Sequence, residues 1–140
     1  MSMMFDTPEG VAFVKAAARK GALSLELKGL KRSSGRQTAY SIVKEVYGFR
    51  GSRESVLADL TEYIEAELRL RAIPEDEYKV ILANTQRQIE YLTGLGKLDQ
   101  PHFEAVIANG EEIGEITHDQ RQAMSDLFYV AIVRQNAAGR

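Results

Sequence analysis

The sequence has no cysteine, only two histidines and three prolines, and no long apolar run. Without cysteine, a disulfide scaffold, a thiolate zinc site and a cysteine nucleophile are excluded. A metal site needs three or four converging ligands, which two separated histidines do not supply, so we expect no metal. The longest apolar run, residues 127–133, is far shorter than the roughly 20 residues of a membrane span, so we expect no membrane contact.

Familiar catalytic and cofactor-binding motifs are missing as well. Residues 94–97 lack the spacing and the final Ser or Thr of a phosphate-binding loop, and residues 109–114 lack the spaced oxygen ligands of a calcium loop. We therefore expect no cofactor and no enzymatic activity. Residues 1–10 carry no basic segment followed by an apolar stretch, so we expect no secretory signal and a cytoplasmic protein.

Charge, in contrast, is abundant and divides by position. From Lys15 to Arg53 there are ten basic residues and two acidic ones, Glu26 and Glu45, whereas residues 54–140 hold eight basic and sixteen acidic residues. The net charge of −2 over 140 residues hides this separation. A basic segment attracts polyanions and an acidic one repels them or binds basic partners, so the separation is the main functional signal.

The apolar pattern predicts an all-α protein, a bundle of five or six helices. Each proline stands where a helix should begin, because the N–H that proline lacks would be unpaired there anyway. The first helix is expected from Pro8 towards Leu30. Residues 22–28 also alternate with a period of two, so a strand is the alternative there, although no second alternating run offers it a partner. Two apolar sets recur at helical spacing along this first helix. One consists of Val11, Val14, Ala18 and Leu25, and the other of Leu23, Leu27 and Leu30.

Later helices are expected at 37–47, 52–71, 75–93, 101–108 and 117–136. Gly48 is placed to end the second, Ser52 to cap the third, and Thr117 with Gln120 to form a capping box for the last. The third helix would bury Leu57, Leu60, Ile64 and Leu68 and turn Glu54, Asp59, Glu62, Glu65 and Glu67 away from the core. The last would turn Met124, Leu127, Phe128 and Ala131 inward.

Two lobes are expected, a basic helical lobe at 1–71 and an acidic helical lobe at 75–140, with one continuous domain as the alternative. Within the first lobe, residues 37–71 combine a short helix, a turn with glycine and a longer helix. This order is typical of a helix-turn-helix motif, whose second helix enters the major groove of DNA. An ordinary helical hairpin with a charged surface is the competing interpretation.

The basic segment supplies the candidate nucleic-acid contacts, because lysine and arginine on adjacent turns and loops suit phosphate. Glu54, Asp59 and Glu62 would face phosphates if the longer helix lay deep in a groove, so we expect contact only through its first turn. Packing of the basic lobe against the acidic one is the other interpretation of the charges. The expected contacts to DNA or RNA are Lys28, Lys31, Arg32, Arg36, Lys44, Arg50 and Arg53, with Tyr40 and Tyr47 beside them.

The last helix is apolar almost all round between residues 127 and 133. Such a helix is usually central in a bundle, and we favour that interpretation. The alternative is an interface with a partner protein or with a second copy, because exposed apolar patches mark interfaces. The residues that would form this interface are Leu127, Phe128, Val130 and Val133.

Segments 7–9, 25–32, 39–42 and 48–52 together resemble a group of short bacterial and phage proteins of unassigned function. The resemblance covers about residues 7–65. It implies a helical module found in bacteria and their phages, and it implies no role for any residue. Residues 75–140 show no such resemblance, which leaves the second lobe as a partner-binding addition.

These observations lead to one hypothesis and one rival. The hypothesis is a non-enzymatic nucleic-acid-binding accessory or regulatory protein of bacterial or phage origin, acting through residues 28–53. The rival is a protein-interaction module, such as a phage or host adaptor or inhibitor, acting through the acidic lobe or the last helix.

Overall fold

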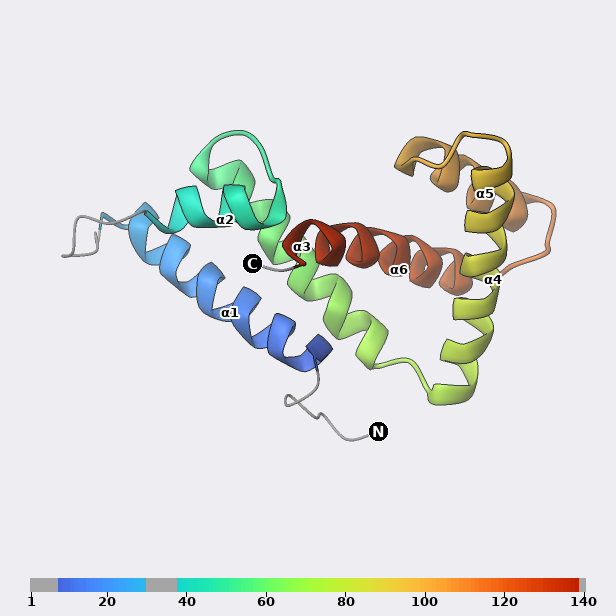
Figure 1. The fold of residues 1–140 in the computed structure, drawn as a ribbon. Coiled ribbons are helices and arrows are strands. Elements are labelled where there is room, and N and C mark those ends of the chain that lie inside the picture. Colours follow the sequence, from blue (N-terminus) through green and yellow to red (C-terminus); the bar gives the residue numbers. More distant parts are fainter. Residues whose placement is uncertain (1–7, 30–37, 139–140) are drawn as a thin grey trace. The chain divides into compact units, whose positions relative to one another are not determined.

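The structure is a computed structural model that describes residues 8–29 and 38–138 (Figure 1). The all-α prediction is confirmed, because the described residues form six helices and no strand. Residues 22–27 belong to the first helix, so the alternative strand at 22–28 is wrong. The helices are α1 Pro8–Leu27, α2 Ala39–Tyr47, α3 Arg53–Arg71, α4 Glu75–Gly94, α5 Gln100–Glu112 and α6 His118–Ala137.

Local capping places several helix ends where the sequence predicts them. Gly48 ends α2 in the left-handed conformation (φ 73°), and its N–H donates to the Lys44 carbonyl at 2.9 Å. The Ser52 hydroxyl accepts from the Ser55 N–H at 3.2 Å at the start of α3. Thr117 and Gln120 form the predicted capping box before α6, with backbone-to-side-chain bonds of 2.9 and 3.1 Å in the two directions.

Of the two apolar sets expected along α1, the one with Val14, Ala18 and Leu25 is not the buried one. Val14 and Leu25 are 48% and 49% exposed, and Ala18 is exposed too, whereas the side chain of Val11 lies outside the described part. Ala16 and Leu23 are fully buried instead. Apolar residues surround much of α1, so periodicity finds two faces without choosing between them. Helix α2 packs against α1.

The core face of α3 is partly wrong. Leu60 and Ile64 are buried as expected, but Leu68 is 45% exposed and Glu67, expected in solvent, is 2% exposed. The centre of the buried face consists of Val56, Tyr63 and Leu70, which are spaced seven residues apart. The buried face is therefore rotated about the helix axis relative to the predicted face. In α6, Met124, Leu127 and Phe128 are buried as expected, whereas Ala131 is exposed.

Helix α5 does not end at the predicted Asn109-Gly110 pair but continues to Glu112. Gly110 accepts hydrogen bonds from the N–H groups of Glu115 (2.9 Å) and Ile116 (3.3 Å), so the chain folds back over it. A Cβ at Gly110 would lie 3.4 Å from the Ile116 side chain. Gly110 therefore allows the segment with Ile116 to approach α5 closely, and it does not end the helix.

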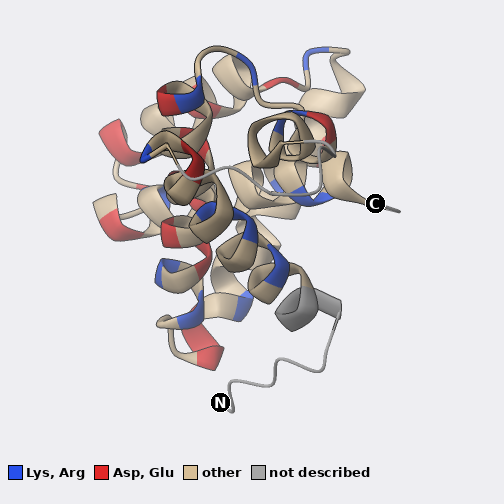
Figure 2. Ribbon diagram, turned by 90° about the vertical axis from the view of Figure 1, so that its left-hand side faces the viewer, with Lys and Arg blue, Asp and Glu red and all other residues tan. Residues whose placement is uncertain are grey.

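The chain divides into two compact units, Met1–Glu65 with Ile132–Arg140 (unit 1) and Ala66–Ala131 (unit 2), and the division falls inside α3 and α6. Unit 1 holds twelve basic and eight acidic residues, and unit 2 holds six basic and twelve acidic ones. In Figure 2 both signs occur along the ribbon, so each unit has an excess of one charge and not a single sign.

Each unit has its own aromatic and polar core contacts. In unit 1, the Tyr47 ring stacks on Phe49 with centroids 5.5 Å apart and contacts Tyr63 at 6.0 Å. In unit 2, Phe103 of α5 stacks on Phe128 of α6 at 4.3 Å.

Candidate nucleic-acid interface

Three of the predicted contacts, Lys44, Arg50 and Arg53, lie around the α2–α3 turn of unit 1. Arg50 and Arg53 are exposed, and Lys44 is half-buried on the last turn of α2. Lys31, Arg32 and Arg36 lie outside the described residues. Lys28 is exposed at the residue after α1.

Two of these cations, Lys44 of α2 and Arg53 of α3, contact the ring of Tyr40. The Lys44 Nζ lies 4.9 Å from the centre of the Tyr40 ring, and the Arg53 guanidinium carbon lies 4.7 Å from it. Both distances are within the range of attraction between a cation and a ring quadrupole. The Tyr40 hydroxyl also donates to the Gly51 carbonyl, which ties the turn to the first turn of α2. The aromatic side chain therefore orders a pair of positive charges.

A hollow of about 680 Å³ lies beside this pair, and we refer to it as the α2 hollow. Its lining contributes two aromatic rings, two cations and one carboxylate. Phe49 is half-buried, with Tyr47 stacked against it, and its remaining surface lines the hollow. The lining residues are Tyr40, Ser41, Lys44, Glu45, Gly48, Phe49 and Arg50.

The end of α1 is fixed to the start of α2 by Glu26. Its carboxylate accepts from the N–H of Ala39 and from the N–H of Tyr40, the latter at 3.2 Å. An anion at a helix N-terminus is favourable, because the first N–H groups have no partner inside the helix. This contact holds the end of α1 at the start of α2 (Figure 1). It also occupies the N–H groups that could otherwise bind a phosphate.

The opposite end of α2 is held by Tyr47. Arg19 of α1 donates to its hydroxyl at 3.1 Å, and Asn136 of α6 donates from its side-chain amide to its carbonyl at 3.1 Å. The ring is 3% exposed. The sequence analysis placed Tyr47 beside the nucleic acid, but the structure places it behind the hollow, where it supports Phe49.

The charges near the hollow are not all positive. Glu54 and Glu62 are exposed on α3, as predicted, and Glu45 lines the hollow itself. Glu54 and Glu62 follow Arg53 along α3, so near the hollow α3 contributes a single cation, Arg53. A polyanion that lay along the whole of α3 would meet repulsion.

The four candidate interface residues of the last helix are buried within the chain. Leu127 is 9% exposed, Phe128 6%, Val130 1% and Val133 2%. This burial agrees with the central position that the sequence analysis favoured for these residues.

Two carboxylates of unit 2 have lowered pKa values. A hydrogen bond from the His102 backbone, followed by one from its ring, lowers the pKa of Asp99, which caps α5 at 2.8 Å from the His102 N–H. A hydrogen bond from Arg121 at 2.9 Å, assisted by His118, lowers the pKa of Glu111. Among the described residues, no group of three or more histidines and carboxylates could hold a metal ion.

Within residues 8–29 and 38–138, every helix is too short or too polar to span a bilayer. Comparison of the chain with protein-family models, with curated proteins and with solved structures found no match. The site is therefore interpreted from its own geometry.

The sequence analysis missed Phe49 as a candidate contact. The signal that could have found it is its position between Tyr47 and Arg50, immediately after the glycine that ends α2. Aromatic residues interleaved with cations are the pattern of single-strand binding surfaces.

Proposed function

We propose that this protein is a nucleic-acid-binding accessory or regulatory protein that contacts a single strand through the α2 hollow. The observation that carries the proposal is the pair of cations, Lys44 and Arg53, held on the Tyr40 ring next to a hollow lined by Phe49 and Arg50. Cations that follow a backbone, together with an aromatic surface for a base, are the two components of single-strand recognition.

Single strands suit this surface better than a duplex groove. A recognition helix lies along the major groove, whereas α3 carries exposed Glu54 within its first turn and exposed Glu62 further along. An unpaired base can instead leave the strand and stack on Phe49 while Lys44 and Arg50 contact its phosphates. The strand thus contacts unit 1 at the α2 hollow. We propose that the protein binds the strand without catalysing a reaction on it.

The experiment is fluorescence anisotropy of a labelled oligonucleotide as single-stranded DNA, single-stranded RNA and duplex, over about 50 to 200 mM salt. We expect the single strands to bind more tightly than the duplex. The double substitution Arg50→Gln with Arg53→Gln removes two phosphate contacts. It should lower the salt slope of log K by about 1.4, since each single-strand phosphate contributes about 0.7.

The matched control is the double substitution Lys79→Gln with Lys97→Gln, which removes two exposed charges from unit 2. It should leave both affinity and slope unchanged. Phe49→Leu should weaken single-strand binding by about 1 kcal/mol without changing the slope, because stacking does not release counterions. Absence of binding at low salt, or equal losses in the two double variants, would contradict the proposal.

Lys31, Arg32 and Arg36 are tested in the same assay by their triple substitution with alanine. The proposal for the α2 hollow expects this variant to lose affinity as well, because the three residues continue the basic segment between Lys28 and the start of α2.

A further inference from the structure

Helix α1 exposes an apolar face in unit 1. Val14, Ala18 and Leu25 are spaced at i, i+4 and i+11, so they form one stripe along the helix, and all three are exposed. The stripe from Val14 to Leu25 is about 16 Å long at the rise of an α-helix. Exposed Lys15 and Lys28 lie along the same helix and at its end. This face has the composition of a basic amphipathic helix whose apolar side is uncovered.

Helix α4 exposes a second apolar face, in unit 2. Val80, Tyr91 and Leu95 are 50%, 58% and 52% exposed, and they are spaced at i, i+11 and i+15. Asn84, Arg87 and Gln88 lie between them on the same side of the helix. Their side chains form no hydrogen bond or ion pair with another described residue. Hence α4 offers a long surface with apolar ends and a polar centre.

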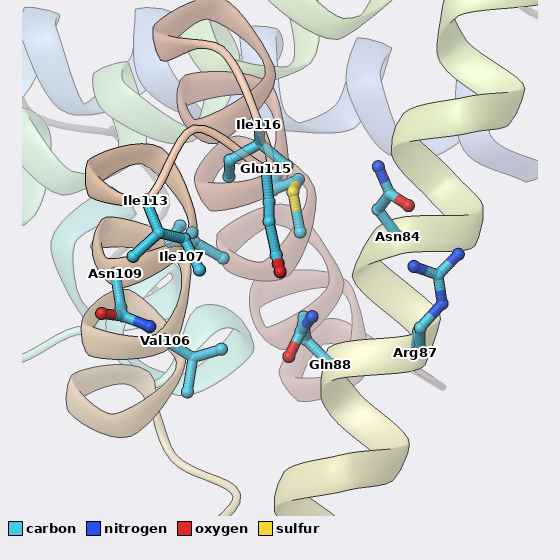
Figure 3. A pocket seen from close by; sticks show the side chains of 11 residues that line it. Asn84, Arg87, Gln88, Val106, Ile107, Asn109, Ile113, Glu115 and Ile116 are labelled. Atoms are coloured by element: carbon cyan, nitrogen blue, oxygen red, sulfur yellow. The ribbon is translucent and has the colours of Figure 1, made fainter.

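A groove of about 520 Å³ opens between this face and α5, and we call it the α4–α5 groove. Figure 3 shows Asn84, Arg87 and Gln88 on α4 opposite Val106, Ile107 and Ile113, with Glu115 between the two sides. One wall is therefore polar and the other aliphatic. Such a groove accommodates an aliphatic side chain whose own backbone or flanking polar groups meet the amides. The aliphatic wall consists of Val106, Ile107, Ile113, Ile116 and Met124.

The charges around the two faces are complementary. The helices that flank the groove, α4 and α5, and the loop after α5 carry exposed carboxylates. Glu115 also lines the groove, whose lining has one cation, Arg87. The α1 face carries lysines, and the two units have opposite excess charge. Charge complementarity favours the encounter of such surfaces and fixes their orientation. The flanking carboxylates are Glu77, Glu90, Glu112 and Glu115.

We propose that the α1 face of one copy of this protein docks in the α4–α5 groove of a second copy, with Leu25 or Val14 in the groove and the lysines at its acidic rim. The contact joins two different surfaces, so it is heterologous and each copy keeps one free face and one free groove. The association is independent of the α2 hollow and so goes beyond the proposed function.

The test uses the full chain, freed of nucleic acid by nuclease treatment, in sedimentation velocity up to high micromolar concentration. We expect the wild type to gain mass with concentration beyond a pair of chains. Leu25→Glu blocks the α1 face. Tyr91→Glu adds a charge to the α4 face one turn from Arg87 and Gln88 of the groove, so each variant alone should remain a monomer. Both residues are about half exposed, so each fold is expected to survive, which helical circular dichroism checks.

Mixing the two blocked variants provides the decisive result. The Leu25→Glu chain keeps its groove and the Tyr91→Glu chain keeps its α1 face, so the mixture should form pairs with one chain of each kind and nothing larger. The matched control Leu68→Glu changes a residue that is 45% exposed outside both faces, and it should associate like the wild type. The variant Arg50→Gln with Arg53→Gln should also associate normally.

A wild type that stays monomeric at all concentrations overturns the proposal. A mixture of the two blocked variants that forms no pairs also overturns it, and so does association of either blocked variant alone. If a glutamate variant loses helicity, Leu25→Ala and Tyr91→Ala replace it. Each of these should weaken association several-fold, whereas Leu68→Ala should not. Failure of this test leaves nucleic-acid binding unaffected, because the variants do not touch the α2 hollow.

Discussion

The carboxylate of Glu26, at the end of α1, accepts a hydrogen bond from the backbone N–H of Tyr40 in the first turn of α2, at 3.2 Å. Glu26 is one of only two acidic residues in the basic segment from Lys15 to Arg53, and this contact explains its presence. It joins the first two helices across a segment that contains four of the basic residues, Lys28, Lys31, Arg32 and Arg36.

We predict that Glu26→Ala lowers the free energy of unfolding by about 1–2 kcal/mol, the usual cost of losing a helix cap with a favourable charge. The measurement is chemical denaturation followed by circular dichroism. Glu90→Ala is the control, because Glu90 is exposed on α4 without a hydrogen-bond partner among the described residues. Equal losses in the two variants would show that the contact does not stabilise unit 1.

Gly51 should tolerate substitution less well than another glycine of positive φ. Gly51 has φ 109°, and an added Cβ would lie 3.1 Å from the Ser55 hydroxyl, whereas Gly114 has φ 82° and open space. Gly114→Ala should cost about 1 kcal/mol from backbone strain alone. Gly51→Ala should cost about 2 kcal/mol or more, because strain and the Ser55 contact add.

The same Gly51→Ala variant should also weaken oligonucleotide binding, since Gly51 lies between Arg50 and Arg53 and its carbonyl holds Tyr40. Anisotropy with Gly114→Ala as the reference checks this. Unchanged affinity in a destabilised Gly51→Ala protein would argue against the turn as a contact.

Asp126 is held by a two-point ion pair in unit 2. Arg69 donates from Nε and from a terminal nitrogen to its two oxygens, both at 2.9 Å, and the Asp126 side chain is 6% exposed. We predict that Asp126→Asn lowers the free energy of unfolding by about 1–3 kcal/mol, because a buried, charged acceptor of two hydrogen bonds is lost.

The control for Asp126 is the exposed pair of Lys79 and Glu75, 3.7 Å apart with both side chains at least 70% exposed. Glu75→Gln should change the free energy of unfolding by at most about 0.5 kcal/mol, as is usual for exposed pairs on a helix. Denaturant titrations of both variants measure the difference. A loss at Asp126 no larger than that at Glu75 would mean that the buried pair is not stabilising.

Asp99 gives a prediction on pH. Hydrogen bonds from His102 lower its pKa in the folded protein. Since the folded pKa is below the unfolded one, the cap contributes stability above about pH 4, the ordinary pKa of aspartate, and this contribution is lost as the pH falls through the lowered pKa. Asp99→Ala should therefore destabilise the protein near pH 7 and have a smaller effect near pH 2.

Denaturation of the wild type and Asp99→Ala over a pH series measures this effect. Asp76→Ala is the reference, because Asp76 is exposed in the first turn of α4 and forms no hydrogen bond with a described residue. A difference between the wild type and Asp99→Ala that does not shrink at low pH would contradict the role of the carboxylate.

Local signals in the sequence predicted the helix ends well. Gly48, Ser52 and Thr117 act within one turn of their own positions, so their roles follow from neighbouring residues alone. It was harder to predict which side of a helix packs against its neighbours. Val14 and Leu25 belong to a regular apolar stripe, but only the position of a neighbouring helix decides that Leu23 is buried and Leu25 is not.

Interactions between distant residues were beyond prediction from one sequence. Asp126 pairs with Arg69 from 57 residues away, and Gly110 lies within α5 with the Ile116 side chain close to it. In the candidate site, Lys44, Arg50 and Arg53 were predicted from their charge. Only the fold shows that Lys44 and Arg53 both lie over the ring of Tyr40. The same holds for the supporting contact between Tyr47 and Phe49.

The most direct test of the account is a titration of isotope-labelled protein with a short single-stranded oligonucleotide, followed by backbone amide shifts. We expect saturable shifts at Tyr40, Lys44, Phe49, Arg50 and Arg53, with unit 2 amides such as those of Lys79 and Lys97 unchanged. Shifts that begin in unit 2, or no shifts at low salt, would contradict binding through the α2 hollow.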